Sequence, residues 1–292
     1  MFTAKEDHDM KIGISGASGQ LGIATIEHLK QRVPAAQIVG ISRSPEKVKV
    51  LGVDARFGDF DAPGSLTEAF AGLDRLLLIP SSDLRPGVRA TQGAAAIERA
   101  VAAGVEHVVF TSSLGKRAAQ ASHLWQSYFV PEQALMRSAR KWSILRMAYY
   151  AESFVDEARM AVAQGVHASL SPTPVNFVSR DDVAAAAAGL LATAGHEGAI
   201  YQATGPASLD GSERAEIIAR AANKPVTFVP VPVEQYRQGL EAAGLPPFVV
   251  DAVLSIQDMW SIGGFDVTTG DVARLSGRPP RSLAEVMNHA FG

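Results

Sequence analysis

The sequence predicts an α/β protein with a doubly wound parallel sheet and a small, mostly helical C-terminal lobe. Strand-like and helix-like segments alternate from residue 11 to residue 150, which is typical of βαβ units. The strand-like segments are continuous apolar runs such as Leu76–Ile79, and strands of this kind are covered on both faces. A glycine-rich turn joins the first strand to the first helix. Together these observations indicate a Rossmann-type sheet.

The predicted elements follow one another in regular order. The expected strands are Lys11–Ser15, Gln37–Ile41, Asp54–Phe57, Leu76–Ile79, His107–Thr111 and Trp142–Arg146. The expected helices are Leu21–Arg32, Pro45–Leu51, Pro63–Phe70, Val88–Ala103 and a segment centred on Pro131–Ser138. After residue 150 the pattern loosens, and the clearest elements are an alanine-rich helix and a late strand, Asp182–Ala194 and Ala199–Ala203.

These elements suggest how the chain is divided. We expect residues 1–10 to form a disordered tail, because they are polar and acidic. Residues 11–152, completed by 178–205, are expected to form the Rossmann-type domain. Residues 153–177 and 206–292 are expected to form a smaller substrate-binding lobe, in which helices are separated by Pro and Gly.

Composition excludes several classes of function. The 292 residues carry a net charge of −3, so no excess of basic residues favours nucleic acid as a partner. No apolar run reaches the roughly 18 residues of a membrane span, and the first ten residues do not resemble a signal peptide, so we expect a cytoplasmic protein. The chain has no cysteine, and no histidines and carboxylates fall at metal-ligand spacing, so we expect no metal. A monomer and a homodimer are both compatible with the sequence.

The glycine-rich turn predicts a dinucleotide site. It reads Gly16-Ala17-Ser18-Gly19-Gln20-Leu21-Gly22. Gly16 permits a tight turn, Gly19 lets the backbone approach a pyrophosphate, and Gly22 lets the helix pack against the strand. The free N–H groups at the start of the helix then face the anion, so we expect all of these residues except Ala17 to contact the cofactor. The alternative is an ordinary glycine-rich turn.

The end of the second strand favours NADPH over NADH. An NAD site usually carries an Asp or Glu there for the ribose hydroxyls, whereas this chain reads Ser42-Arg43-Ser44. Arg43, with Ser42 and with Lys47 one helical turn further on, is suited to a 2′-phosphate. Asp59 follows the third strand, where it either meets the adenine edge or caps a helix.

Residues after the later strands complete the candidate site, because ligands bind at the carboxyl ends of parallel strands. Two groups are expected to contact the cofactor, namely Pro80, Ser81 and Ser82 after the fourth strand and Thr111 and Ser112 after the fifth. The expected substrate contacts are Ser113, Met147, Tyr149 and Tyr150. Tyr150 is the preferred polar contact with the substrate, and the alternative is a buried structural tyrosine.

The chain resembles the NmrA-like branch of the atypical short-chain dehydrogenases/reductases. Within that branch it is similar to the bacterial type 2 NAD(P)H:quinone oxidoreductases and the triphenylmethane dye reductases. Besides the glycine-rich turn, the more specific matching pieces are Gly195-His196-Glu197-Gly198 and Leu145-Arg146 followed by Tyr150. The resemblance spans almost the whole chain. It implies NADPH as cofactor and hydride transfer, without flavin, to a small conjugated aromatic acceptor such as a quinone, an azo dye or a triphenylmethane dye.

Two departures from the family pattern bear on catalysis. The Tyr-x-x-x-Lys motif of typical short-chain dehydrogenases is absent, since Tyr128 is followed at the fourth position by Glu132. Gln133 stands where the quinone reductases have a lysine near the nicotinamide, and we expect it to take that catalytic and cofactor-binding place. Met147 replaces an asparagine. These losses keep open an alternative function, an NmrA-like redox sensor that binds NADP without turnover.

Overall fold

The computed structural model describes residues 10–115 and 121–292. Its centre is a seven-stranded sheet in the order β10-β6-β5-β4-β1-β2-β3, and every neighbouring pair is parallel. The strands are β1 (Ile12–Ser15), β2 (Ile38–Ser42), β3 (Asp54–Phe57), β4 (Arg75–Leu78), β5 (His107–Ser113), β6 (Lys141–Met147) and β10 (Ala199–Ala203). The predicted Rossmann-type sheet is confirmed. The predicted disordered tail lies almost wholly outside the described residues.

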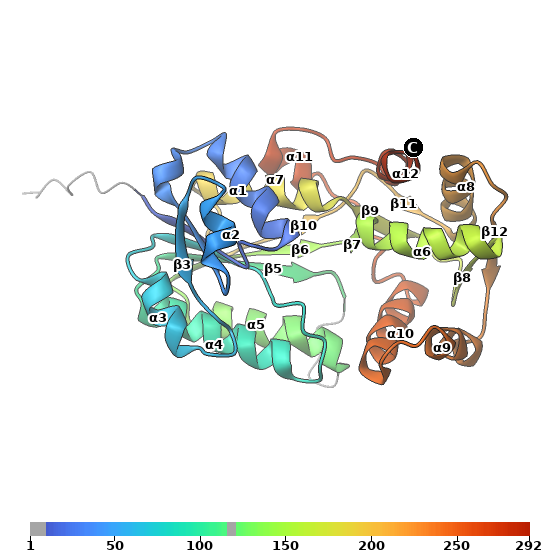
Figure 1. Cartoon of the computed structure of the whole chain (residues 1–292), viewed down its shortest axis with the longest axis horizontal. Helices are drawn as coiled ribbons and strands as arrows, with labels where there is room; N and C mark the ends of the chain where they lie inside the picture. The colour runs from blue at the N-terminus through green and yellow to red at the C-terminus, as the bar shows by residue number, and fades with distance from the viewer. Residues whose placement is uncertain (1–9, 116–120) are drawn as a thin grey trace, which may run out of the picture.

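Helices cover both faces of this sheet (Figure 1). One face carries α1 (Gln20–Lys30), α7 (Arg180–Ala192) and α11 (Asp271–Ser276), and the other carries α3 (Gly64–Phe70), α4 (Val88–Ala102) and α5 (His123–Ser138). The short helix α2 (Pro45–Lys49) lies beside β3. Covering on both faces explains why β1, β2 and β5 are buried along their whole length.

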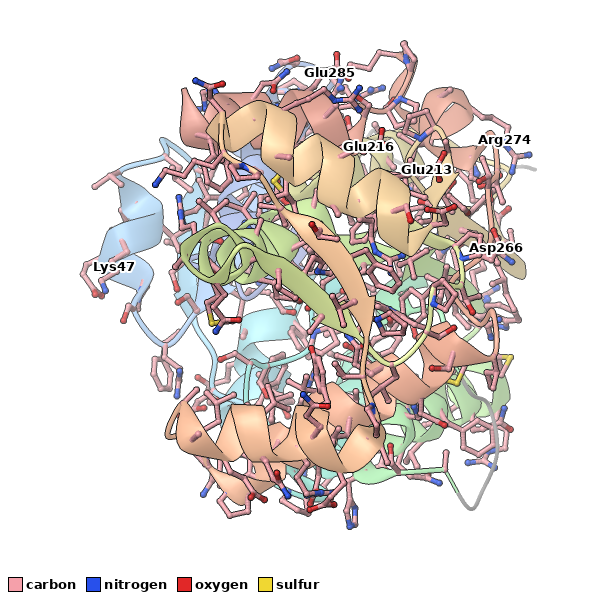
Figure 2. The ribbon with its side chains drawn as sticks, turned by 90° about the vertical axis from the view of Figure 1, so that its right-hand side faces the viewer. Lys47, Glu213, Glu216, Asp266, Arg274 and Glu285 are labelled. Carbon is pink, nitrogen blue, oxygen red and sulfur yellow. The ribbon has the colours of Figure 1, made fainter. Side chains whose placement is uncertain are left out.

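The C-terminal lobe stands at one end of the sheet, on the right of Figure 1. Its helices are α6 (Ala151–Gln164), α8 (Gly211–Ala222), α9 (Val233–Ala242), α10 (Pro247–Ser261) and α12 (Leu283–Phe291). Viewed from the lobe end, α8, α6 and α9 lie one below another (Figure 2). The lobe is therefore mostly helical, as predicted.

Two small sheets in and beside the lobe were not predicted. One joins β7 (Tyr149–Tyr150), β9 (Val175–Val178) and β11 (Ser208–Leu209), and the other joins β8 (Val166–Ser169) and β12 (Thr227–Pro230). β9 ends directly before α7, so this small sheet carries the chain back from the lobe to the edge of the main sheet where β6 ends.

Candidate functional site

A cavity of about 680 Å³ opens at the carboxyl ends of the parallel strands. It lies across the switch point of the sheet, where β1 pairs with β2 on one side and β4 on the other, which is where ligands bind in this architecture. The structure brings most of the predicted site residues together here. The predicted residues that line it are Gly16, Ser18, Gly19, Gln20, Leu21, Gly22, Ser42, Arg43, Asp59, Pro80, Ser81, Ser82, Thr111, Met147 and Tyr150.

The turn between β1 and α1 has the geometry that its glycines predict. Gly16 has φ +64°, a conformation that side chains disfavour. A Cβ on Gly22 would collide with the carbonyl oxygen of Gly16 and lie 2.7 Å from Ala17 Cα. α1 begins after Gly19 without a side-chain cap, so its first N–H groups are directed to the cavity without a competing hydroxyl or carboxylate.

Polar and basic side chains gather where β2 ends. The hydroxyls of Ser18 and Ser42 lie 2.7 Å apart, and Ser42 Oγ also accepts the N–H of Ser44 at 3.0 Å. Arg43 is exposed at the rim, and no described residue binds its guanidinium. Lys47 lies on the outer surface of α2, away from the cavity lining (Figure 2). This corner therefore offers one unpaired guanidinium and two hydroxyls to an anion.

A chain of hydrogen bonds fixes the neighbouring rim. Ser81 Oγ donates to Gln92 Oε1, and Gln92 Nε2 donates to Asp61 Oδ1 at 2.7 Å. Asp59 Oδ1 accepts the N–H of Asp61 at 3.0 Å, which closes a local turn. The N-cap of α3 is Pro63, so Asp59 does not cap that helix. Asp59 lines the cavity, and its expected place at the adenine edge stays a prediction.

The far end of the cavity lies where β6 ends, and it is aromatic and basic. Tyr150, Met147 and Tyr128 line it together with two arginines, Arg89 and Arg180. Burial raises the pKa of the Tyr150 phenol, so this group stays protonated at neutral pH. No described residue hydrogen-bonds the Tyr150 hydroxyl, which leaves it able to bind a ligand.

Five predicted residues do not line the cavity: Lys47, Ser112, Ser113, Gln133 and Tyr149. The hydroxyl of Tyr149 donates to Glu157 at 2.6 Å, and its ring packs edge-on against Trp260 at 5.0 Å between centroids. Tyr149 and Tyr150 are neighbours in an extended segment, so their side chains point to opposite faces. Only Tyr150 faces the cavity.

Glu132, at the place of the lysine in the Tyr-x-x-x-Lys motif, is part of a buried ion pair. Arg146 Nε and Nη2 donate to its two oxygens at 3.0 and 2.7 Å, and Ser112 Oγ donates to it at 2.6 Å. Its exposed fraction is 1%. This cluster joins α5 to β5 and β6, and removal of one partner would leave a buried charge unpaired. Glu132 and Ser112 therefore support the fold beside the site and do not face a ligand.

A second cavity of about 530 Å³ adjoins the first, and Asp83 and Arg89 line both. Its walls come from the loop before α4, the start of α5, and helices α9 and α10 of the lobe. Apolar residues such as Trp125, Leu254 and Phe248 alternate there with charged ones. This space, between sheet and lobe, is large enough for a small aromatic ligand.

Arg89 and Arg180 are site residues that the sequence analysis missed. Arg180 follows β9, a strand hidden in the loosely patterned stretch after residue 150. The available signal was the short segment Val175–Val178, in which three of the four residues are apolar, placed just before a strong helix. Arg89 lies in the first turn of α4, where an arginine has no distinctive pattern.

Two features are absent from the part of the chain that the structure describes. No helix there is long and apolar enough to cross a membrane. No group of three or more His, Asp or Glu side chains there is arranged to hold a metal ion.

Comparisons with known proteins agree with this geometry. The family model described as NAD(P)H-binding matches residues 16–194. Quinone oxidoreductase 2 of Escherichia coli is 33% identical in sequence over 96% of this chain and 98% of its own. The structure of the NADPH-dependent quinone oxidoreductase from that organism, complexed with NADPH, superposes with a TM-score of 0.89 over 96% of this chain and 100% of its own. The triphenylmethane reductase of a Citrobacter species, complexed with NADP(H), is 31% identical with a TM-score of 0.86 over 96% of this chain and 100% of its own. The NAD(P)H azoreductase of Xenophilus azovorans is 26% identical over 93% of this chain and 95% of its own.

Proposed function

The chain belongs to the family of NAD(P)H-binding proteins, and on this premise we propose that it is a reductase that prefers NADPH and passes hydride, without flavin, to a conjugated aromatic acceptor. That it is an NAD(P)H-dependent oxidoreductase follows from relatives that match nearly its whole length. The preference for NADPH, the direct transfer and the aromatic acceptor are the parts we propose.

The observation that carries this proposal is the span of the first cavity. It runs from Arg43 beside β2 to Tyr150 beside β6. In the sheet, β1, β4 and β5 lie between these two strands, so four strand spacings of about 4.8 Å, or roughly 19 Å, separate the two ends. An extended dinucleotide would place its adenosine half near Arg43, its pyrophosphate on the glycine-rich turn, and its nicotinamide near Met147 and Tyr150.

The chain's own residues support NADPH as the cofactor. Gly22 lets α1 pack closely on the turn, because a Cβ there would collide with the backbone of Gly16, and α1 begins without a side-chain cap, so its first N–H groups are free to bind a phosphate. Arg43 is an unpaired guanidinium suited to a 2′-phosphate, and no acidic residue stands at the end of β2 to bind a free 2′-hydroxyl.

When bound, the cofactor supplies the hydride, so this chain has to position the acceptor and exclude competing reactions. The second cavity opens beside the nicotinamide end and offers apolar walls to an aromatic ring. Tyr150 keeps its proton and can donate a hydrogen bond to an acceptor oxygen or nitrogen. The final proton comes from water, since Glu132 stands at the lysine position of the Tyr-x-x-x-Lys motif.

The test is oxidation of NADPH by the purified protein with no added flavin, against quinones, azo dyes and triphenylmethane dyes, with NADH in parallel. Bound flavin is assayed by the absorbance of the denatured supernatant. The proposal expects turnover with at least one acceptor, a higher kcat/KM for NADPH than for NADH, and no flavin. Turnover that depends on flavin would refute direct transfer. Tight NADPH binding without turnover on any acceptor would favour the redox-sensor alternative.

A further inference from the structure

Two arginines flank a pair of tyrosines at the acceptor end of the first cavity. The guanidinium carbon of Arg89 lies 4.9 Å from the centroid of the Tyr128 ring, and Arg89 Nη2 donates to the Tyr128 hydroxyl at 3.2 Å. The guanidinium carbon of Arg180 lies 5.1 Å from the centroid of the Tyr150 ring. All four side chains line the cavity. The tyrosine faces thus hold two cations at the place where the acceptor must lie.

Neither guanidinium forms an ion pair with a described residue. Within residues 10–115 and 121–292 no group hydrogen-bonds the Arg180 side chain, and Arg89 Nε is buried without a partner. Asp83, the carboxylate nearest in sequence to Arg89 on the cavity wall, is bound through both oxygens by Arg85. The positive charge of Arg89 and Arg180 is therefore available to a ligand, and an unpaired buried N–H gains most from an anionic acceptor atom.

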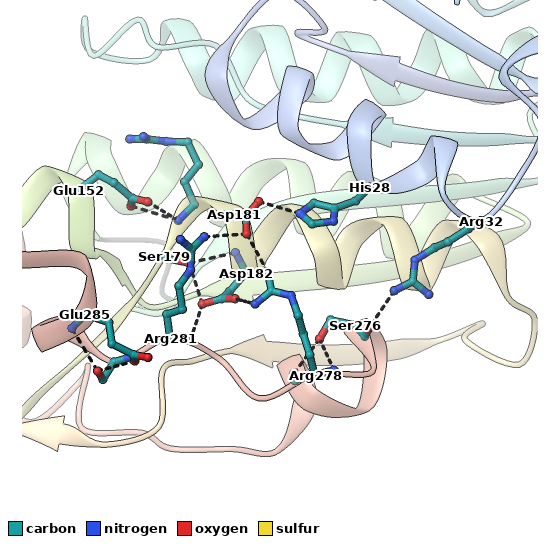
Figure 3. A network of polar contacts seen from close by, with 12 residues as sticks. His28, Arg32, Glu152, Ser179, Asp181, Asp182, Ser276, Arg278, Arg281 and Glu285 are labelled. Atoms are coloured by element: carbon teal, nitrogen blue, oxygen red, sulfur yellow. Dashed lines mark hydrogen bonds and ion pairs between the residues drawn. The ribbon is translucent and has the colours of Figure 1, made fainter. Parts of the chain in front are cut away.

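The start of α7 is held firmly, which fixes Arg180 in place. Both oxygens of Glu152 accept the backbone N–H of Arg180, at 2.9 and 3.0 Å, and Ser179 caps the helix. The next two residues, Asp181 and Asp182, are bound by arginines of the C-terminal segment and by His28 of α1. Figure 3 shows this network between α1, α7 and the C-terminal segment. A backbone anchored from three sides limits where the Arg180 side chain can lie.

We propose that Arg180 and Arg89 form an anion site for the acceptor, so that the enzyme selects quinones and anionic aromatic compounds over cationic dyes. The inference rests on the proposed function and names the substrate class of that same site. The arrangement also explains how hydride transfer could proceed without a Tyr–Lys pair, because the two guanidiniums stabilise negative charge that a proton donor would otherwise have to remove at once.

Reduction of a quinone develops negative charge beside the two arginines. A neutral quinone accepts a hydride, with its two electrons, on one carbonyl oxygen; a new O–H bond forms and the other oxygen becomes a phenolate. The C–H bond of the dihydronicotinamide that held the hydride breaks, which leaves NADP+, and water then gives a proton to the phenolate to complete the hydroquinone. The phenolate, and the transition state that leads to it, carry the charge that Arg180 and Arg89 stabilise. A cationic dye is repelled by the same two residues when it binds.

The test compares two ligands with the same rings and different charge. The first is 2-hydroxy-1,4-naphthoquinone, which is an anion at pH 7.5, and the second is its neutral 2-methoxy analogue. Both are titrated calorimetrically into protein loaded with NADP+, so that no turnover occurs. We expect the anion to bind the wild-type protein at least tenfold more tightly than its neutral analogue, since a hydrogen bond to a charged group is worth about ten- to hundredfold in affinity.

Variants then assign the preference to the arginine. Arg180→Gln should weaken binding of the anion about tenfold or more, and binding of the methoxy analogue much less. Arg180→Lys should keep most of the preference for the anion. Crystal violet, a cation, should bind Arg180→Gln more tightly than wild type. The matched control is Arg159→Gln, because Arg159 is exposed on α6, pairs with Asp156 and lines neither cavity. Thermal melting checks that each variant is folded, and Arg89→Gln replaces any variant that is not.

Two results would overturn the anion site: equal affinity of the wild-type protein for the two quinones, or an equal loss of affinity for both quinones in Arg180→Gln. These results are distinguishable from failure of the proposed function. A protein that prefers the anion but never oxidises NADPH keeps the anion site and is not the proposed reductase. A protein that turns over both quinones without any preference for charge is the reductase without the anion site.

Discussion

Glu157→Gln is expected to make the protein more stable at pH 8 and to flatten the dependence of its stability on pH. Glu157 is partly buried on α6, and its carboxylate accepts the hydroxyl of Tyr149 at 2.6 Å. Burial raises the pKa of Glu157 from 4.5 to about 7, although the hydrogen bond from Tyr149 and the charge of Arg214 oppose the rise. The glutamine keeps an oxygen to accept from Tyr149 but never ionises.

The size of the effect follows from these two pKa values. Below about pH 4 the carboxyl is protonated in the folded and the unfolded chain, so it contributes no pH dependence. Between pH 4.5 and about pH 7 the carboxyl is ionised in the unfolded chain but still protonated in the folded chain, so the free energy of unfolding falls as the pH rises. At about 1.4 kcal/mol per pH unit, the full loss is about 3 kcal/mol, and it is complete above pH 7.

The assay is urea denaturation followed by tryptophan fluorescence at several pH values between 4 and 8. Glu157→Gln and wild type should have similar free energies of unfolding near pH 4, and the variant should exceed wild type by up to about 3 kcal/mol at pH 8. Glu216→Gln is the matched control, because Glu216 is exposed on α8 (Figure 2). Parallel pH profiles for wild type and Glu157→Gln would refute the reasoning that burial of this carboxyl costs stability.

Three further predictions concern the proposed cofactor and acceptor. Arg43→Ala should weaken NADPH binding about ten- to hundredfold and NADH binding little. The control Lys49→Ala, on the outer side of α2, should change the affinity for neither nucleotide. An equal loss of affinity for NADPH and NADH in Arg43→Ala would show that Arg43 does not bind a 2′-phosphate. Gly19→Val should abolish nucleotide binding in calorimetry without loss of the folded state, because its Cβ would stand 3.2 Å from Gly16 O where the pyrophosphate approaches; retained affinity would mean that the turn is not the site. Tyr150→Phe should lower kcat with the best acceptor and leave the Kd of NADPH unchanged; an unchanged rate would make Tyr150 a packing residue.

Local sequence patterns predicted the main sheet and the glycine-rich turn, because the residues that determine these features are close together in the sequence. The alternation of apolar strands and helices placed the seven strands of the main sheet, including Ala199–Ala203. The glycine-rich turn predicted one wall of the cavity, because its glycines are needed by contacts within the turn itself; a Cβ on Gly22, for example, would collide with the backbone of Gly16.

The acceptor end could not be predicted in this way, because its residues depend on side-chain direction and on distant contacts. A shift of one residue decides that Tyr150 faces the cavity and Tyr149 faces Glu157. Gln133 lies on α5 outside both cavities, although the resemblance suggested a place near the nicotinamide. Arg180 reaches the site only because β7 and β9 pair, and two strands this short leave little periodic signal.

We propose that hydride passes directly from NADPH to an aromatic acceptor held between the sheet and the lobe. The most direct test is a single turnover in which flavin-free protein loaded with NADPH, or with NADPH deuterated on the transferred position, is mixed rapidly with 2-hydroxy-1,4-naphthoquinone. We expect loss of NADPH absorbance in step with quinone reduction, and a slower reaction with the deuterated cofactor. Reduction only after flavin is added, or no reduction by protein that binds NADPH tightly, would contradict it.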